Sequence, residues 1–347
     1  MEKVFVQKVG SVTSRLGSLS SVNVLSSSRQ SRIGDVVVVR ALSESTSYGN
    51  LELSSGRLAK INRGDILLGA LGKRRALKGF VGNVPQTIAA GDRLHLLNMG
   101  GVVGICEGHH SSFTDAIELE VIGTACDTQG NVLNIGDGAL TPANRLAPSA
   151  PIVLIAGSCM NSGKTVAATE IIKQATSAGL SVAAAKISGV ACLRDTLNMK
   201  DHGAIATASF LDCGLPSTVD HDDLASVAKA ILNHLNSLSP DMIVVELGDG
   251  IVGGYSVDAV LKDKEIMGAV NSFVFCASDY VGVIGGAAVL KDFGIDIDVV
   301  AGSVTDSQMG EDYIRERLGL SAGNARREGK RLFELVSSKP ERVRLAA

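Results

Sequence analysis

The residues with the clearest chemical potential are Gly157-Ser-Cys-Met-Asn-Ser-Gly163-Lys164-Thr165. The stretch lies between an apolar run and a segment with apolar residues at helical spacing, which places it on a turn from strand to helix. The backbone N–H groups of such a loop, together with the start of the helix, bind phosphate oxygens. The pattern predicts a nucleoside triphosphate site in which Lys164 reaches the β and γ oxygens and the Thr165 hydroxyl binds Mg²⁺. The expected nucleotide ligands are Gly157, Ser158, Asn161, Ser162, Gly163, Lys164 and Thr165.

Two further charged residues end apolar runs downstream of this loop. Lys186 follows the run 182–185, and Glu246 follows the run 242–245. Ligands of parallel sheets bind beyond the carboxyl ends of the strands. We therefore expect Glu246 to hold Mg²⁺, and Lys186 to act with Lys164 as a catalytic cation that stabilises the transferred phosphoryl group. The alternatives are a solvated strand-end carboxylate and a lysine that extends to solvent.

Other candidates surround these positions in the sequence. Asp195 is a candidate second Mg²⁺ ligand, although acidic residues are also common in the first turn of a solvated helix. His221 lies among aspartates, and a helix N-terminus explains this cluster better than a metal site does. The small-residue turns after the two strands are candidates for substrate binding, through Ser188, Gly248, Asp249 and Gly250.

The loop resembles that of dethiobiotin synthetase and the cobyrinic acid amidases, because five residues rather than four separate Gly157 from Gly163. In that P-loop family a lysine ends the second strand, as in Ala185-Lys-Ile-Ser-Gly189, and a glutamate precedes a glycine loop, as in Val245-Glu-Leu-Gly-Asp-Gly250. The order and spacing agree over about residues 150–310. The resemblance implies a Mg²⁺-dependent, ATP-consuming ligase, in which a carboxylate takes the γ-phosphoryl group and an amine captures the resulting acyl or carbamoyl phosphate.

Departures from that family leave the substrate and the base open. Cys159 and Asn161 stand where the synthetases have an acidic residue in the loop, and residues 302–306 replace an asparagine that reads adenine. The lack of an Asn-Lys-x-Asp motif favours ATP over GTP. Two other functions stay open: a kinase for a small molecule or for polynucleotide 5′-hydroxyl groups, and a nucleotide-switched carrier or accessory protein for cofactor assembly.

Nucleic acid is not the expected substrate. The chain has 8 Phe, 4 Tyr and no Trp in 347 residues, and its net charge is −3. Stacking platforms and a basic surface are what single-stranded nucleic acids need. Lys73, Arg74, Arg75 and Lys78 form one local basic patch, which we expect to be solvated surface, with an anionic ligand or RNA as the alternative. A small anionic metabolite is the expected substrate.

The elements that position these residues change character near residue 149. From there apolar runs alternate with amphipathic segments, which predicts an α/β domain with a parallel P-loop sheet and helices on both faces. The expected strands are 151–157, 180–189, 241–250, 272–278 and 297–304, and the expected helices are 163–179, 224–238, 282–294 and a charged, interrupted tail over 308–338.

Residues 1–148 are expected to form a separate small all-β domain, a barrel or a sandwich. The dipeptide Gly-Asp precedes apolar runs at Gly34-Asp35, Gly64-Asp65 and Gly91-Asp92. Glycine tolerates positive φ and aspartate bonds to nearby backbone, so each pair predicts a turn into a strand. Prolines and small residues over 146–151 indicate a linker. The predicted domains are therefore 1–148, of unassigned role, and 149–347.

The sequence also suggests where the protein works. It contains no secretory signal at its start and no uncharged apolar run of the ~18–20 residues that a membrane span needs. Six scattered cysteines without a C-x-x-C pair are typical of reduced thiols. We expect a soluble, cytoplasmic protein with no membrane partner, and a homo-oligomer, most simply a homodimer.

Overall fold

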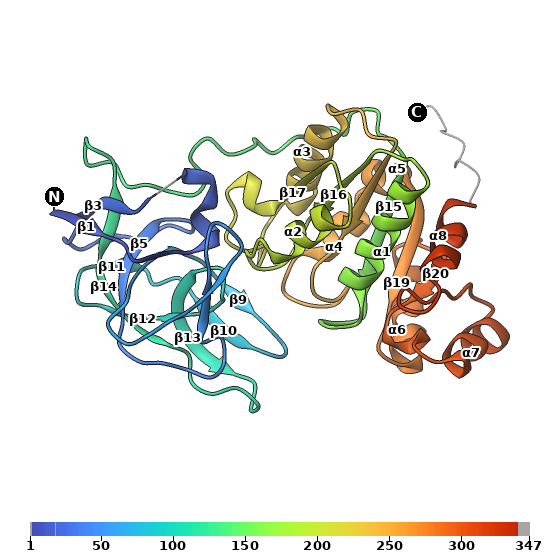
Figure 1. Cartoon of the computed structure of the whole chain (residues 1–347), viewed down its shortest axis with the longest axis horizontal. Coiled ribbons are helices and arrows are strands. Elements are labelled where there is room, and N and C mark those ends of the chain that lie inside the picture. The colour runs from blue at the N-terminus through green and yellow to red at the C-terminus, as the bar shows by residue number, and fades with distance from the viewer. Residues whose placement is uncertain (1, 18, 339–347) are drawn as a thin grey trace. The chain divides into compact units, whose positions relative to one another are not determined.

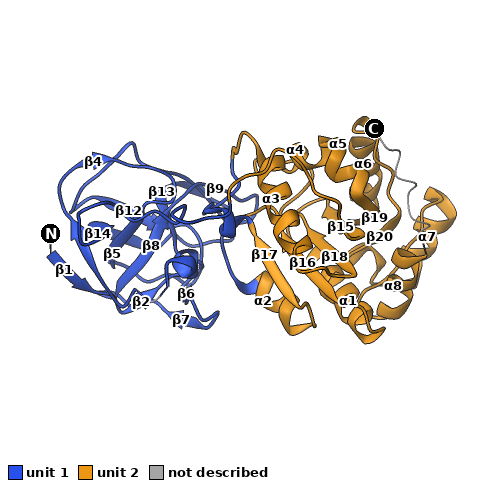
Figure 2. Ribbon diagram, turned by 90° about the horizontal axis from the view of Figure 1, so that it is seen from above, with its two compact units in different colours: residues 1–140, 190–194, 210–219 blue, residues 141–189, 195–209, 220–347 orange. Residues whose placement is uncertain are grey.

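The computed structural model describes residues 2–17 and 19–338 (Figure 1). It divides the chain into two compact units that are not contiguous in sequence (Figure 2). Unit 1 comprises residues 1–140, 190–194 and 210–219, and unit 2 comprises residues 141–189, 195–209 and 220–347. The predicted boundary between residues 148 and 149 lies inside unit 2. Two short segments from the carboxyl-terminal half belong to unit 1.

Unit 1 is built from short strands, with a 3₁₀ helix, η1 (Ser11–Leu16), and a second one, η2 (Phe210–Cys213). Its strands are β1 (Glu2–Phe5), β2 (Lys8–Val9), β3 (Ser21–Leu25), β4 (Arg29–Gln30), β5 (Val36–Ala41), β6 (Asn50–Glu52), β7 (Leu58–Lys60), β8 (Ile66–Leu71), β9 (Arg74–Arg75), β10 (Phe80–Asn83), β11 (Thr87–Ile88), β12 (Arg93–Leu96), β13 (Val102–His109) and β14 (Glu118–Cys126). Strand β12 pairs with both β13 and β14, which closes the path β14–β5–β8–β13 into a five-stranded barrel. Of the two predicted all-β forms, the structure has the barrel.

The three Gly-Asp pairs do turn the chain into strands. Gly34, Gly64 and Gly91 have φ angles of 84°, 94° and 91°, in the left-handed region. The aspartate that follows each glycine accepts a hydrogen bond from the backbone N–H three residues earlier. The strands β5, β8 and β12 begin directly after these turns, so the prediction from turn chemistry is confirmed.

Arg74 does not belong to the solvated patch that the sequence suggested. Its side chain is 2% exposed, and its guanidinium lies 4.5 Å from the ring centroid of Tyr48. The same group donates hydrogen bonds to the Tyr48 hydroxyl, at 2.6 Å, and to the Leu97 carbonyl. These contacts compensate for burial of the cation, and the prediction of a solvated basic patch is wrong for this residue.

Unit 2 contains one six-stranded sheet in which every pairing is parallel, in the order β17–β16–β18–β15–β19–β20. Its strands are β15 (Ile152–Gly157), β16 (Val182–Lys186), β17 (Ala206–Ser209), β18 (Met242–Glu246), β19 (Val270–Cys276) and β20 (Val299–Ala301). Its helices are α1 (Lys164–Ser177), α2 (Arg194–Asp201), α3 (Leu224–Asn236), α4 (Val257–Lys262), α5 (Lys264–Ala269), α6 (Tyr280–Asp292), the 3₁₀ helix η3 (Ser303–Thr305), α7 (Gln308–Leu318) and α8 (Gly329–Ser337).

Helices cover both faces of this sheet, as predicted. The core beneath α1 and α8 includes Val274 and Cys276 of β19. Phe275 lies between them and points to the opposite face, where a Cβ on Gly286 of α6 would lie 2.2 Å from its ring. Because helices cover both sides of these strands, the strands are apolar throughout. Their apolar runs made five of the six strands predictable from the sequence.

The edge strand β17 and the helices α4 and α5 were not among the predicted elements. Helix α2 carries Asp195 in its first turn, as the alternative interpretation of Asp195 expected. β17 has the sequence Ala-Thr-Ala-Ser, which lacks an apolar run, and its parallel pairing with β16 decides its conformation. Within the described residues, no helix combines the length and the apolar character needed to cross a membrane.

Candidate functional site

The phosphate loop, residues 157–164, joins the carboxyl end of β15 to α1 and is anchored at both ends. The Ser158 N–H donates to the carbonyl of Cys276 at the end of β19, at 2.9 Å. The Gly157 carbonyl accepts a hydrogen bond from the Ile251 N–H, also at 2.9 Å. At the far end, the Ser162 carbonyl accepts from the Ser303 N–H at 3.3 Å. The loop is therefore held by the end of β19 and by the segments that follow β18 and β20.

The loop requires its two glycines and leaves its backbone donors available. A Cβ at Gly157 would lie 2.6 Å from the Ser162 hydroxyl, and a Cβ at Gly163, where φ is 100°, would lie 2.8 Å from the Cα of Gly302. Asn161 also adopts the left-handed region, with φ of 62°. Among the described residues, the backbone N–H groups of residues 159–163 have no protein acceptor. Such a run of donors forms the concave site that binds phosphate.

Lys164 is folded back on the loop that precedes it. Its side chain is 5% exposed, and Nζ donates to the Cys159 carbonyl at 2.7 Å. Burial lowers the pKa of Lys164, and the positive charge of Lys186 acts in the same direction. A phosphate anion bound in the loop would favour the charged form of this lysine.

Lys186 and Glu246 are brought together by the register of the sheet. They are partners on the adjacent parallel strands β16 and β18, and Nζ of Lys186 lies 2.6 Å from Oε1 of Glu246. The same carboxylate oxygen accepts a hydrogen bond from the Thr165 hydroxyl at 2.9 Å. On its other side, Lys186 contacts the Asp195 carboxylate at 2.9 Å. Four residues chosen from the sequence thus form one cluster beside the phosphate loop.

The electrostatics of this cluster keep Lys186 charged. Burial by itself would lower the pKa of Lys186, but the carboxylates of Asp195 and Glu246 outweigh this effect and raise it. Glu246 is 1% exposed, so it is not the solvated strand-end carboxylate considered above. Lys186 likewise pairs with two carboxylates rather than extending into solvent.

The residues present fit a magnesium ion. The second carboxylate oxygen of Glu246, Oε2, is buried and has no hydrogen-bond partner among the described residues. It belongs to the same side chain that contacts the Thr165 hydroxyl, so two hard oxygen donors lie together next to the phosphate loop. Mg²⁺ is usually held by one or two such groups, phosphate oxygens and water rather than by a complete protein cage. The described residues contain no group of three or more His, Cys, Asp or Glu arranged as a metal centre.

The proposed substrate residues line the turns beside Lys186 and the phosphate loop. The Ser188 hydroxyl donates to the Gly248 carbonyl at 3.0 Å, which ties the turn after β16 to the turn after β18. A Cβ on Gly248 would lie 2.1 Å from the Ser188 carbonyl oxygen, and one on Gly250 would lie 2.5 Å from the Ser158 carbonyl oxygen. Side chains at these positions would force the three loops apart.

Asp249 is held between these glycines with φ of 64°. Burial raises the pKa of its carboxyl group, while the charges of Lys164 and Lys186 act in the opposite direction. A carboxylate that is partly desolvated near two cations is a candidate proton acceptor.

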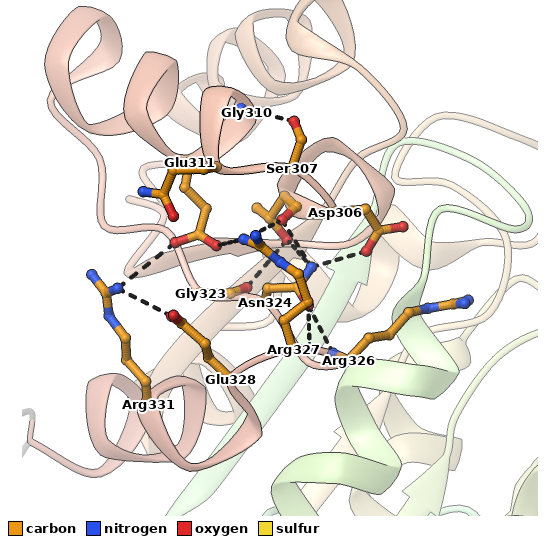
Figure 3. A network of polar contacts seen from close by, with 12 residues as sticks. Asp306, Ser307, Gly310, Glu311, Gly323, Asn324, Arg326, Arg327, Glu328 and Arg331 are labelled. Atoms are coloured by element: carbon orange, nitrogen blue, oxygen red, sulfur yellow. Dashed lines mark hydrogen bonds and ion pairs between the residues drawn. The ribbon is translucent and has the colours of Figure 1, made fainter.

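A polar network that the sequence did not reveal fixes the segment after β20 (Figure 3). Asn324 is 1% exposed, and its amide nitrogen donates to the Thr305 carbonyl at 2.8 Å and to the Asp306 carboxylate at 2.9 Å. Its amide oxygen accepts from the N–H groups of Arg326 and Arg327. The same segment reaches the phosphate loop through Ser303.

Carboxyl-terminal arginines extend this network, while the side chains of Arg327 and Arg331 stay 38% and 44% exposed. The Glu311 carboxylate is fully buried and pairs with Arg315 at 3.2 Å. It also pairs with Arg327, and with Arg331 at 3.9 Å (Figure 3). Arginines that surround a buried carboxylate offset its desolvation. These arginines come from α7, from the loop before α8 and from α8, so no local pattern in the sequence indicates their shared partner.

The aspartates around His221 belong to a helix N-terminus, and two further histidines have separate partners. Asp223 is the N-cap of α3 and accepts a hydrogen bond from the Ser226 N–H at 3.1 Å, which agrees with the helix N-terminus expected near His221. His109 lies 3.2 Å from the Asp115 carboxylate, whereas His110 contacts the Ser112 hydroxyl. These two adjacent histidines have different partners and form no joint site.

Comparisons with known proteins do not place the chain in a family. No family model matches it, and no curated protein matches it. Three similar solved structures are chloroplast FtsY from Physcomitrella patens, the cell division protein FtsY from Thermotoga maritima, and the 54 kDa signal recognition particle protein from Aeropyrum pernix in complex with GDP. Their identities to this chain are 13%, 15% and 18%, with TM-scores of 0.39, 0.38 and 0.38. Each covers 58% of this chain, and this chain covers 70%, 74% and 51% of them respectively. The predicted resemblance to dethiobiotin synthetase is not supported by these comparisons.

Proposed function

We propose that the protein is a Mg²⁺-dependent enzyme that binds ATP and transfers its γ-phosphoryl group to a small anionic acceptor. The observation that carries this proposal is the carboxylate of Glu246. One of its oxygens contacts Thr165, the residue directly after the phosphate loop, and the other is buried without a partner among the described residues. A buried, half-satisfied carboxylate is costly. A divalent cation coordinated next to the triphosphate would satisfy it.

In the proposed reaction, different residues of the site bind phosphate, stabilise charge and hold the metal ion. The N–H groups of residues 159–163 bind phosphate oxygens, and Lys164 exchanges the Cys159 carbonyl for the β and γ oxygens. Lys186 is already fixed by Glu246 and Asp195, so its charge stabilises the transferring phosphoryl group without reorganisation. When bound, Mg²⁺ would neutralise charge on the β and γ oxygens, held by Thr165 and Glu246.

The proposed reaction class is ligation. A carboxylate oxygen of the substrate attacks the γ-phosphorus, the bond to the bridging oxygen breaks, and ADP leaves with that electron pair. An amine then attacks the acyl carbon, phosphate leaves, and one proton is released from nitrogen. Asp249, which lies in the turn after β18, is the proposed acceptor of that proton. Ser188, Gly248 and Gly250 would bind the acceptor beside Lys186.

The nucleotide site is tested by Lys164→Ala, with Lys173→Ala as the matched control. Both lysines lie on α1, but the Lys173 side chain is 56% exposed and that of Lys164 is buried. Loss of a buried charge that pairs with phosphate costs about 2–5 kcal/mol, so we expect affinity for Mg²⁺–ATP in calorimetry to fall at least about 30-fold in Lys164→Ala only. Wild-type affinity in this variant would rule out the phosphate-loop assignment.

The reaction class needs a separate test. The protein is incubated with Mg²⁺–ATP and a panel of small carboxylates and amines, while phosphate release and new C–N bonds are followed by mass spectrometry. A ligase should form product only with both partners, and hydroxylamine should trap the acyl phosphate when the amine is omitted. Consumption of ATP without a C–N bond in any combination would contradict ligation and leave the nucleotide site intact.

A further inference from the structure

The ammonium group of Lys186 lies among oxygen atoms that would also suit a divalent cation. Its Nζ is 2.6 Å from Oε1 of Glu246 and 2.9 Å from Oδ2 of Asp195. The Thr165 hydroxyl contacts the same Glu246 oxygen at 2.9 Å. Carboxylate and hydroxyl oxygens are ligands that Mg²⁺ and Mn²⁺ prefer. The lysine therefore lies between the two carboxylates, at a position to which a metal ion would also be attracted.

These carboxylates need a positive charge beside them, because little water reaches them. Glu246 is 1% exposed, and the Asp195 side chain is 26% exposed. A carboxylate that is removed from water and left without a countercharge is strongly destabilising. Lys186, whose own side chain is 13% exposed, supplies that charge from β16, the strand next to β18. While the phosphate loop is empty, the protein itself thus provides the cation.

Lys186 also brings the cluster close to neutrality. The charged groups that influence one another here are Lys164, Lys186, Asp195, Glu246 and Asp249. Two cations against three carboxylates leave little net negative charge, and a divalent ion placed beside an ammonium group is repelled by it. The several negative charges of a bound nucleoside triphosphate would reverse this balance. Oε2 of Glu246, which has no partner among the described residues, would then be available to the metal while Lys186 keeps Oε1.

We propose that Lys186 makes metal binding conditional on the nucleotide. While the phosphate loop is empty, its ammonium group neutralises Asp195 and Glu246 and excludes free divalent cations. Mg²⁺ binds only together with the triphosphate, whose charge outweighs that of the lysine. This inference rests on the proposed nucleotide and Mg²⁺ site, and it assigns Lys186 a role before phosphoryl transfer as well as during it.

The first test removes the charge and measures metal binding without nucleotide. Mn²⁺ is the probe, because electron paramagnetic resonance measures the free ion directly. Lys186→Met keeps a long unbranched side chain and removes the ammonium group. We expect this variant of the full chain to bind Mn²⁺ alone at least about 10-fold more tightly than the wild type, because one neighbouring positive charge is gone. Lys186→Arg keeps the charge and should bind Mn²⁺ alone as weakly as the wild type.

Lys229 provides the matched control, because it also lies between two carboxylates. Its Nζ is 2.8 Å from Asp263 and 2.9 Å from Glu265, and its side chain is 10% exposed. Neither carboxylate has a buried oxygen that lacks a partner among the described residues. The Glu265 side chain is 42% exposed, so water can replace the lysine. Lys229→Met should therefore gain no Mn²⁺ binding, and a gain equal to that of Lys186→Met would overturn the proposal.

The second test adds the non-hydrolysable ATP analogue AMP-PNP, with the analogue and Mn²⁺ without protein as the blank. The wild type should bind Mn²⁺ at least about 10-fold more tightly with the analogue than without it. The analogue should strengthen Mn²⁺ binding less in Lys186→Met, because that variant already holds the ion. Equal Mn²⁺ affinity of the wild type with and without bound analogue would overturn the proposal.

Circular dichroism verifies that each variant is folded. If Lys186→Met unfolds in metal-free buffer, it is refolded with Mn²⁺, which should restore the wild-type spectrum and a cooperative melt because a ligand of the folded state stabilises it. No recovery with Mn²⁺ would also overturn the proposal. A wild type that binds Mg²⁺–ATP while Lys186→Met gains no Mn²⁺ affinity would refute this role of Lys186 alone, whereas a wild type that does not bind Mg²⁺–ATP in calorimetry would refute the proposed function.

Discussion

At the scale of single residues, Glu246 is the centre of the site. One of its oxygens is shared by Lys186 and Thr165, and the other is buried and unpartnered among the described residues. A carboxylate in this position can bind a divalent cation only if it keeps its negative charge.

Glu246→Gln keeps the size of the side chain and removes that charge. We expect kcat for Mg²⁺-dependent turnover to fall about 100-fold or more, with a higher Mg²⁺ requirement, because several kcal/mol of charge stabilisation come from such a metal. Steady-state phosphate release measured across a Mg²⁺ titration checks this. Glu316→Gln, at an exposed position on α7, is the control and should behave as wild type. An unchanged Mg²⁺ requirement in Glu246→Gln would refute the assigned metal ligand.

The carboxyl group of Asp249 makes the free energy of unfolding depend on pH. Burial raises its pKa in the folded protein above the ordinary 3.8, so between these two values the folded state binds more protons than the unfolded state. Its contribution to the free energy of unfolding is therefore largest at low pH and is lost as pH rises through the folded pKa.

Asp249→Asn removes a charge that is costly at neutral pH and keeps a side chain that tolerates φ of 64°. We expect a higher urea midpoint than wild type at pH 7, with a difference that shrinks as the pH falls towards 3.8. Turnover should fall while nucleotide affinity is retained. Asp222 is an exposed neighbour of the α3 N-cap, and Asp222→Asn should shift neither the urea midpoint nor turnover. A lower midpoint at pH 7 would show that the carboxylate stabilises the fold.

At the scale of elements, the contact of α6 with β19 rests on the missing side chain of Gly286. A Cβ there would lie 2.2 Å from the ring of Phe275, which is itself fully buried. Overpacking of this kind costs about 1–3 kcal/mol.

Gly286→Ala should therefore lower the free energy of unfolding by about 1–3 kcal/mol in urea titrations. Gly268→Ala, in α5, is the matched control, since a Cβ at this position meets no atom of the described residues within 4 Å. It should be neutral or stabilising by up to about 1 kcal/mol. Equal changes in the free energy of unfolding for the two substitutions would mean that α6 does not pack tightly against β19.

At the scale of the whole molecule, each of the two units is built from three separate segments of the chain. Residues 190–194 and 210–219 belong to unit 1. Within that unit the buried Glu52 carboxylate accepts hydrogen bonds from the N–H groups of Leu193 and Arg194, at 2.7 and 2.8 Å. A carboxylate with these donors holds the segment in place.

A fragment of residues 149–347 would retain both segments and lose the rest of unit 1. We expect it to melt at a lower temperature and less cooperatively than the full chain, and to bind the dye ANS, because the residues that pack with the two segments are missing. Circular dichroism melts of both proteins check this. A fragment that melts cooperatively at the temperature of the full chain would contradict it.

The sequence by itself determined the elements whose signals are local. The phosphate loop, the apolar strands beside it and the Gly-Asp turns of unit 1 were predictable, because glycine conformations, aspartate turns and strands buried on both faces depend on neighbouring residues. The candidate positions Lys186 and Glu246 also followed from strand ends.

Only the tertiary structure decided how these signals combine. The closure of the barrel by β12, the burial of Arg74 against Tyr48, the edge strand β17 and the Asn324 network all join residues that are distant in sequence. The shared oxygen of Glu246 depends on the register between β16 and β18 and on the start of α1. Such contacts are set by packing of the whole chain, and no local pattern of residues encodes them.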